Sequence, residues 1–237
     1  MSNHIFINKK ISNFKKKINV ASDKSISIRS ILLASQAVGI SKISNLLESE
    51  DVLNTLKAIK KLGINYKKKS GDYFIEGFGL NNFNINKRIT INAGNSGTLA
   101  RLILGLLVKS KFKIRLIGDK SLSKRDFSRV IKPLRLFGVN IQSRKNSLPI
   151  EILGTDYLRP ISYNEKIGSA QVKSCIIFCA LNTPGTTQIK AKKSRNHTEQ
   201  LLRSLNYPIK VNKINNIDKI SISGLSQFKS FKYIIPG

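Results

Sequence analysis

Apolar and polar residues follow one another in a pattern that occurs three times along the chain. Each occurrence begins with a small polar turn that leads into an apolar helix. A short strand, an amphipathic helix and a hairpin come next. The apolar helices are predicted to begin near Ser25, Ser96 and Ser169, which are 71 and 73 residues apart. Each serine is a candidate N-cap, because its side-chain oxygen can accept a hydrogen bond from a free backbone N–H group.

This pattern predicts an α/β (α+β) fold with three β-α-β-α-β-β repeats in one domain. The units are expected at about residues 21–85, 86–157 and 158–225, within a domain of residues 21–228. Such a domain either buries its helices inside and faces its sheets outward, or stacks both as layers, and the pattern allows both. In a symmetric arrangement the N-termini of the apolar helices converge on one side. Each exposed N-terminus favours an anion by about 0.3–1 kcal/mol.

The composition is that of a globular protein with an unusual charge. The chain has 237 residues, 41% of them hydrophobic, and a formal net charge of +29. A basic chain can bind a polyanion such as nucleic acid. However, the chain has 31 lysines and only 11 arginines. The lysine runs at 15–17 and 67–69 also lack interleaved aromatic residues that could stack on bases. We interpret the charge as a coding bias on solvated faces and predict no nucleic-acid partner, with a basic nucleic-acid-binding module as the alternative.

The sequence also limits the location and the metal chemistry. The apolar run "LILGLLV" stops at Lys109, too short to span a bilayer, and "MSNHIFINKK" lacks the apolar core of a secretory signal. A cytoplasmic protein without a membrane partner is therefore expected. Cys175 and Cys179 are predicted to be buried thiols that act as small hydrophobic residues. A zinc site would need more ligands than His4 and His197 could add, so no metal is expected.

One loop has the composition of an anion site. In "NAGNSGTLARLILGLL" the glycine-bearing residues 94–98 run into an apolar helix with Arg101 in its first turn. Free N–H groups at a helix N-terminus and a nearby guanidinium both favour an anion. The spacing fits neither the GxxxxGK[ST] loop nor the GxGxxG loop. Five arginines fall in or beside such loops and first turns, namely Arg29, Arg101, Arg125, Arg129 and Arg195.

Five motifs in order make the interpretation more specific: "DKSISIRSILLAS", "GNSGTLARLILGLL", "GDKSLSKRDFSRVIKPLR", "SAQVKSCIIFCAL" and "SRNHTEQLL". Together they resemble the 5-enolpyruvylshikimate-3-phosphate synthase family, from about Ala21 to the last residue. The resemblance implies transfer of the enolpyruvyl group of phosphoenolpyruvate to the 5-hydroxyl of shikimate 3-phosphate, with release of phosphate and no cofactor. It also implies two similar domains of three β-α-β-α-β-β units each, in a monomer at full length.

The resemblance carries over to individual positions. It implies a shikimate 3-phosphate site made of Lys24, Ser25, Arg29, Ser169, Ala170, Gln171, Ser194 and Arg195. It implies a phosphoenolpyruvate site made of Lys24, Asn95, Gly97, Thr98, Arg125 and Gln171. Lys24 would reach both anions and is the catalytic residue implied in this chain. Taken singly, Ser25 and Ser169 could be caps only, Arg29 could pair with a carboxylate, and Gln171 could be solvated. Arg101 and Arg129 are interpreted as structural or supporting residues.

Some positions depart from the family pattern. Ile28, Asp126 and Asn196 stand where the family commonly has His, Pro and Asp. None of these departures removes a substrate-contacting side chain that the resemblance implies. A UDP-sugar enolpyruvyl transferase and a non-catalytic, ligand-binding remnant are two competing interpretations of the same motifs.

Both ends of the chain are expected to belong with a second domain. In the family, residues 1–20 would join that other domain, and residues 229–237 would begin the crossover to it. The remaining catalytic carboxylates, a lysine and two arginines would lie beyond Gly237, the last residue of "YIIPG". The chain alone is therefore expected to bind shikimate 3-phosphate weakly and to be inactive.

Overall fold

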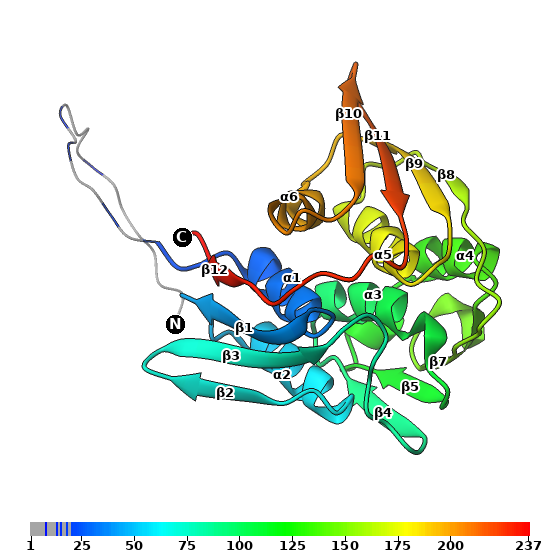
Figure 1. Ribbon diagram of the computed structural model, residues 1–237, viewed down its shortest axis with the longest axis horizontal. Helices are drawn as coiled ribbons and strands as arrows, with labels where there is room; N and C mark the ends of the chain where they lie inside the picture. Colours follow the sequence, from blue (N-terminus) through cyan, green and yellow to red (C-terminus); the bar gives the residue numbers. More distant parts are fainter. Residues whose placement is uncertain (1–7, 9–12, 14, 16–17, 19) are drawn as a thin grey trace.

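The fold consists of three four-stranded sheets around a group of central helices (Figure 1). The structure is a computed structural model that describes residues 8, 13, 15, 18 and 20–237. The expectations for His4 and for most of residues 1–20 therefore lie outside the described residues. Within the described part, no helix is long and apolar enough to cross a membrane.

The second and third units have the predicted order of elements, and the first has the same order from its first helix onward. The first contains α1 (Lys24–Ala34), β1 (Val38–Ser44), α2 (Glu50–Lys61), β2 (Tyr66–Lys69) and β3 (Asp72–Phe78). The second contains β4 (Ile89–Asn92), α3 (Gly97–Leu106), β5 (Ile114–Ile117), α4 (Ser128–Leu136), β6 (Asn140–Ser143) and β7 (Ile150–Leu153). The third contains β8 (Ser162–Glu165), α5 (Ala170–Leu181), β9 (Thr186–Lys192), α6 (His197–Ser204), β10 (Ile209–Ile214) and β11 (Ile217–Ser223). The last strand is β12 (Lys232–Ile234).

All three sheets have the same topology. Their strand orders are β12-β1-β3-β2, β4-β5-β7-β6 and β8-β9-β11-β10. In each sheet the first pair of strands is parallel and the other pairs are antiparallel. The mixed fold with three repeated units is therefore as predicted, but with one difference. The opening strand of the first unit is β12, which pairs with β1 in the register Lys42↔Lys232. The described residues just before α1 form no strand, and Asp23 already caps that helix.

The C-terminal segment lies against the start of the first unit. Residues 229–237, expected to begin a crossover, include β12 and so complete the first sheet. The last residue, Gly237, is exposed and lies beside Val20, since a Cβ atom on Gly237 would come within 2.6 Å of the Val20 carbonyl oxygen. The expectation of catalytic groups beyond Gly237 stays a prediction.

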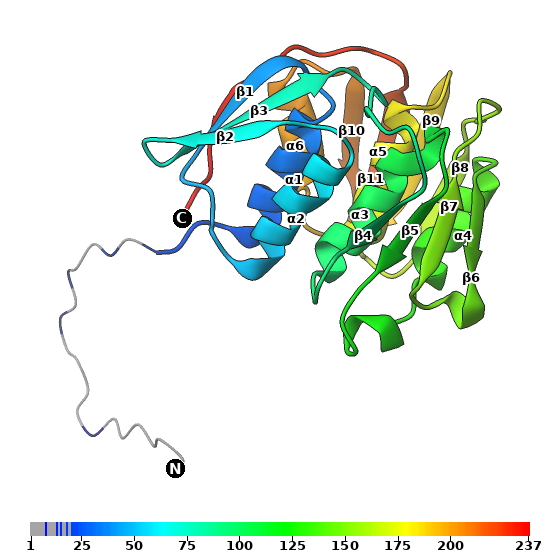
Figure 2. The ribbon, with the colours of Figure 1, turned by 90° about the horizontal axis from the view of Figure 1, so that it is seen from below.

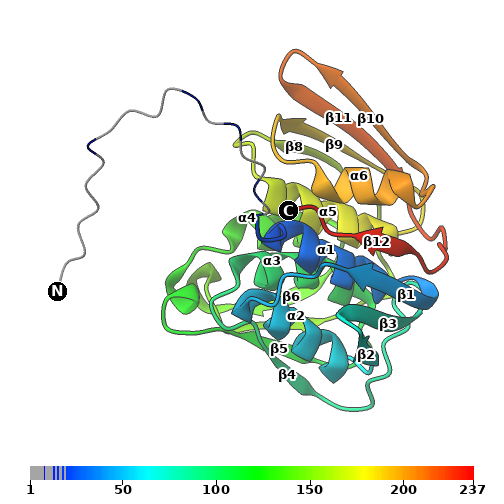
Figure 3. The same cartoon turned by 90° about the vertical axis from the view of Figure 1, so that its left-hand side faces the viewer.

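The helices are inside and the sheets outside, so the arrangement as stacked layers is excluded. In α5 every residue from Val172 to Leu181 is buried, which explains its apolar composition all around the helix. By contrast, α2 buries one face only, at Val52, Thr55 and Ile59 among others. Figure 2 shows α1 and α3 side by side between the sheets, and Figure 3 shows the C-terminal strand beside α1.

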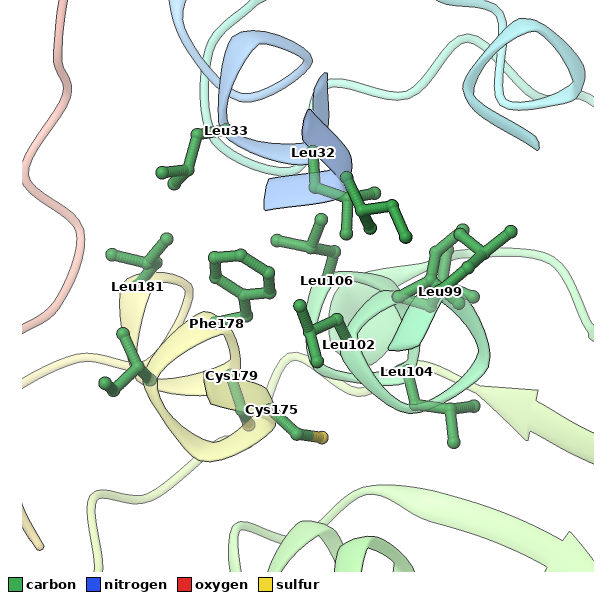
Figure 4. Close-up of a cluster of buried hydrophobic side chains, with 14 of the residues drawn as sticks. Leu32, Leu33, Leu99, Leu102, Leu104, Leu106, Cys175, Phe178, Cys179 and Leu181 are labelled. Atoms are coloured by element: carbon green, nitrogen blue, oxygen red, sulfur yellow. The ribbon is translucent and has the colours of Figure 1, made fainter. Parts of the chain in front are cut away.

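The centre of the core is the contact between α3 and α5. Figure 4 shows Leu102 and Leu106 of α3 facing Phe178 of α5, with side chains of α1 above them. A Cβ atom at Gly105 would overlap the carbonyl oxygen of Cys175, so the close approach of the two helices requires glycine there. Both cysteines are free and buried, as predicted, and burial raises the pKa of Cys175 to about 12.

A glycine at the end of each hairpin packs against the loop after the first helix of its unit. The three glycines are Gly77, Gly154 and Gly224. A Cβ atom there would overlap the backbone of Ala37, Ser110 and Thr183, respectively. These contacted residues all lie just beyond the C-terminus of a central helix. The three units therefore share a close backbone contact at this glycine, and a larger residue in its place would prevent the contact.

Candidate anion-binding site

The loop at residues 94–98 has the conformation of a helix start. Helix α3 begins at Gly97, and the Ser96 hydroxyl accepts a hydrogen bond from the Leu99 N–H at 3.3 Å, which confirms Ser96 as the N-cap. Gly94 adopts φ +56°, a left-handed conformation that glycine tolerates well. Its N–H donates to Asn92 Oδ1 at 2.9 Å. The first N–H groups of α3 are thus held at a fixed and partly exposed edge.

Arg125 lies beside this helix end. Its guanidinium donates to Asn95 Oδ1 at 3.3 Å, and Asn95 in turn donates to Asp119 Oδ2 at 2.5 Å. The Leu122 N–H and the Asn95 amide hold the pKa of Asp119 below its usual value. In the part of the chain that the structure describes, Arg125 forms no ion pair with a carboxylate. Its exposed positive charge is therefore available to an anion at the start of α3.

Arg101 supports this arrangement from the other side of Gly97. It donates to the Gly97 carbonyl and to the Asp126 carbonyl, both at 3.2 Å, and lies 4.7 Å from the ring centre of Phe127. Burial, together with the nearby Arg125, lowers the pKa of Arg101. Arg101 thus connects α3 with the segment just after Arg125. This agrees with a structural role for Arg101. Arg129 is exposed on α4 and adds positive charge near Arg101.

A hydrogen bond joins the first turns of α3 and α5. Gln171 Nε2 donates to Thr98 Oγ1 at 3.0 Å. Ser169 is the N-cap of α5, as predicted, since its hydroxyl accepts from the Val172 N–H at 3.4 Å. The turn before it is held by the buried carboxylate of Glu165, which accepts hydrogen bonds from three successive N–H groups at 2.6–3.1 Å. Ala170, partly exposed, is the first residue of the helix.

Arg29 lies at the meeting point of three helices. Its Nε donates to Thr198 Oγ1 of α6 at 2.9 Å, and its Nη2 donates to Ser174 Oγ of α5 at 3.1 Å. Its Nη1 donates to the Ser25 carbonyl of α1 at 3.1 Å. Burial lowers the pKa of Arg29 to about 10, against the opposing effect of Glu199, so the group remains a cation at neutral pH. These bonds and the Gln171 bond place the starts of the three central helices on one side, as predicted for a symmetric arrangement.

The expectation that Ser25 caps α1 is wrong. Asp23 is the N-cap, and its carboxylate accepts from the Ile26 N–H at 2.7 Å. The helix therefore begins at Lys24, and Ser25 lies in its first turn with its side chain partly exposed. Aspartate and serine are about equally good N-caps, so only their positions distinguish Asp23 from Ser25.

Lys24 and the loop before α6 complete the set of predicted residues. Lys24 Nζ forms an ion pair with Asp51 of α2 at 2.9 Å and remains half exposed. Ser194 is partly buried, and its hydroxyl has no hydrogen-bond partner among the described residues. Arg195 is exposed and near enough to Arg29 to lower its pKa. The predicted residues thus gather in two groups, one around α3 and Arg125 and one around Arg29, with Gln171 bonded to the first group.

Three carboxylates at this face were not identified from the sequence. Asp119 lies two residues after the end of β5, inside the motif "GDKSLSKRDF", and this motif is the one signal that could have marked it. Asp51 belongs to the site because it forms an ion pair with Lys24. Glu165 belongs to it because its carboxylate accepts hydrogen bonds from the turn before α5. No group of three or more His, Cys, Asp or Glu that could hold a metal ion occurs within residues 20–237 or at the four other described positions.

Comparison with known proteins gives the context for this geometry. A model of the EPSP synthase (3-phosphoshikimate 1-carboxyvinyltransferase) family matches residues 8–237. The chain belongs to the EPSP synthase family. Its fold is also that of an EPSP synthase structure from Acinetobacter baumannii, with a TM-score of 0.85 and 37% identity, over 94% of this chain and 50% of that one.

Two curated relatives of this EPSP synthase family member carry the name 3-phosphoshikimate 1-carboxyvinyltransferase. The protein of Ruthia magnifica subsp. Calyptogena magnifica is 42% identical over 233 residues, which are 98% of this chain and 52% of that protein. The protein of Streptococcus pyogenes serotype M2 is 39% identical over 223 residues, which are 93% of this chain and 51% of that protein. The chain thus spans about half the length of the curated relatives it matches.

Proposed function

We propose that this chain supplies one side of the active site of a 3-phosphoshikimate 1-carboxyvinyltransferase. The reaction joins the 5-hydroxyl oxygen of shikimate 3-phosphate to the enol carbon of phosphoenolpyruvate, and the carbon–oxygen bond to the phosphate breaks to release phosphate. The observation that supports this best is the pair of cationic groups at the starts of α3 and α1, each suited to one of two anionic substrates. The proposal includes a cytoplasmic location and no membrane partner, because both substrates are small soluble anions. It also includes, from the family resemblance, the absence of a cofactor and a monomer at full length.

Phosphoenolpyruvate is assigned to the group around α3. The planar guanidinium of Arg125 matches the geometry of a carboxylate or phosphate, and the first N–H groups of α3 favour negative charge. Gly97 allows both guanidiniums to lie close to the helix start, because a Cβ atom would come within 2.7 Å of Arg101 Nη1 and 3.2 Å of Arg125 Nη1. Asn95 and Thr98 contribute further polar groups beside it.

Shikimate 3-phosphate is assigned to the group around Arg29. An arginine has five N–H donors, and the three bonds described above use three of them, which leaves two for an anion. The unpartnered Ser194 hydroxyl, the exposed Arg195 and the start of α5 at Ser169 provide further donors. Lys24 is assigned to both anions, since its ammonium has three donors on a flexible stem and would exchange Asp51 for a ligand.

Replacing Arg125 by alanine is expected to weaken the binding of phosphoenolpyruvate by at least tenfold. The reason is that one charge-assisted hydrogen bond contributes about 1.5–3 kcal/mol. Binding of shikimate 3-phosphate should change little, because Arg29 and not Arg125 supplies its charge. Isothermal titration of the 237-residue chain with each substrate measures both values. Equal losses for the two ligands would contradict the assignment of Arg125.

Replacing Gly97 by alanine is expected to weaken phosphoenolpyruvate binding as well, by about tenfold. The new methyl group would push the flexible ends of Arg101 and Arg125 away from the start of α3, which costs little in stability but moves two cations away from the anion. Loss of one charge-assisted hydrogen bond corresponds to about 1.5–3 kcal/mol. The same titration measures the effect, and circular dichroism checks that the fold is retained. A Gly97→Ala variant with native affinity for phosphoenolpyruvate would show that no ligand approaches this point.

Duplex DNA is expected to bind the chain only weakly at physiological ionic strength and without sequence preference. A scattered positive charge gives non-specific binding with a dissociation constant of about 10⁻⁴–10⁻⁶ M, and the affinity falls steeply as salt is added. Fluorescence anisotropy with two unrelated duplexes at several salt concentrations measures this. A tight complex that distinguishes the two duplexes would favour the nucleic-acid-binding module over the proposed enzyme.

A further inference from the structure

A buried group of three charges lies beside the residues that hold Arg29. Lys173 of α5 is fully buried, and its ammonium lies 2.7 Å from Glu199 Oε1 of α6 and 3.2 Å from Asp218 Oδ2 of β11. Both carboxylates are buried as well. None of these residues belongs to the substrate sites assigned above, although Lys173 occurs in the motif "SAQVKS" and Glu199 in "SRNHTE".

The ammonium is the group that compensates for the burial of Glu199. Neither carboxylate oxygen of Glu199 makes a hydrogen bond with the described residues, so its stabilisation comes from nearby positive charge. Lys173 is the partner in direct contact, and Arg29 is near enough for Glu199 to oppose the lowering of its pKa. Burying a carboxylate without such a partner is strongly unfavourable. The position of α6 against α5 therefore depends on this ion pair.

The ion pair is next to the contacts that hold Arg29. Thr198 and Ser174, which accept the Arg29 hydrogen bonds, are the neighbours of Glu199 and Lys173 in sequence. Thr198 Oγ1 also donates to Ser174 Oγ at 2.8 Å. Helices α5 and α6 are thus joined twice in succession, once by Lys173 and Glu199 and once by Ser174 and Thr198. A shift of α6 that lengthened the ion pair would also separate the two hydroxyls that orient the guanidinium.

We infer that Lys173 is a positioning residue that, through Glu199 and Asp218, holds Thr198 and Ser174 where they orient Arg29 toward the anionic group of shikimate 3-phosphate. The inference rests on the proposed function for the identity of the ligand. The orientation of Arg29 by the buried charges does not rest on it, because that orientation exists in the chain without a ligand.

The test uses a variant that removes the three charges together: Lys173→Met, Glu199→Gln and Asp218→Asn. This triple variant leaves no unpaired charge among the three residues, and the buried Arg29 keeps Asp23 as a nearby carboxylate, so the variant is expected to fold. Its affinity for shikimate 3-phosphate is expected to fall by about tenfold or more, which corresponds to about 1.4 kcal/mol, while its affinity for phosphoenolpyruvate stays native. Leu116→Ala, a core substitution in the second unit, is the control for a general loss of stability.

A second measurement follows Arg29 without any ligand. The Nε–H signal of Arg29 in a ¹⁵N NMR spectrum, assigned by its loss in Arg29→Lys, is expected to exchange slowly in the native chain and in Leu116→Ala. It should exchange at least about tenfold faster in the triple variant, because the bond to Thr198 is no longer held. An unchanged exchange rate in the triple variant would overturn the inference, and so would native affinity of that variant for shikimate 3-phosphate. A loss of affinity for shikimate 3-phosphate alone in Leu116→Ala would also overturn it. If the native chain does not bind shikimate 3-phosphate, the proposed function fails, and the exchange rate still decides the role of Lys173.

Discussion

Replacing Lys173 alone by methionine is expected to lower the free energy of unfolding of the chain by about 3–5 kcal/mol, because Glu199 and Asp218 then remain buried without their partner. Stability of a domain is typically about 5–15 kcal/mol in total, so this is a large part of it. Urea denaturation followed by circular dichroism measures the change, with the slope of the transition as a check on two-state behaviour.

Two controls make this prediction specific. Arg88→Met removes a cation from an exposed ion pair with Glu151 and should change stability much less, because solvent and salt screen that pair. Adding Glu199→Gln and Asp218→Asn to Lys173→Met should restore much of the lost stability, since no charge is then left buried alone. A single Lys173→Met variant as stable as the native chain would show that water reaches these carboxylates.

Replacing Gly224 by alanine is expected to lower the free energy of unfolding by about 3 kcal/mol. The new methyl group would overlap the carbonyl oxygen of Thr183, which is backbone and cannot rotate away. Overpacking of this kind typically costs about 1–3 kcal/mol, and the stiffness of a backbone contact favours the upper end. Denaturant unfolding measures the loss, and Ser223→Ala in the preceding, partly exposed position should have little effect. Native stability in the Gly224→Ala variant would contradict the prediction, because it would mean that the third sheet can shift away from Thr183 without cost.

The fold was predictable wherever its cause lies in neighbouring residues. The three apolar helices and their hairpins follow from periodicity, and Ser96 and Ser169 are the caps that local chemistry indicates. Two features were not predictable in this way. Asp23 and Ser25 are both good caps, and only the first residue of the helix distinguishes them. The pairing of β12 with β1 joins residues far apart in the sequence, and such a partner leaves no local signal.

The candidate site shows the same division. The loop at 94–98 and Arg125 lie within short motifs, so the sequence indicated them, although their contact with ligand stays a prediction. The environment of Arg29 was not predictable, because Ser174 and Thr198 come from another unit. The same holds for Lys173, which in sequence alone would be placed on the solvated side of its helix. Its burial follows only once Glu199 and Asp218 are seen around it.

The place of β12 has a consequence for the order in which the domain assembles. The second and third sheets form from continuous stretches of chain, whereas the first pairs strands whose residues lie 190 positions apart, as Lys42 and Lys232 do. Closing so long a loop costs more entropy and slows folding. During synthesis the first sheet therefore stays one strand short until residues 232–234 leave the ribosome. Because Asp23 N–H already donates to the Pro236 carbonyl at 2.9 Å, a permuted chain joined at that point and opened near residue 226 would make every unit continuous and remove the delay.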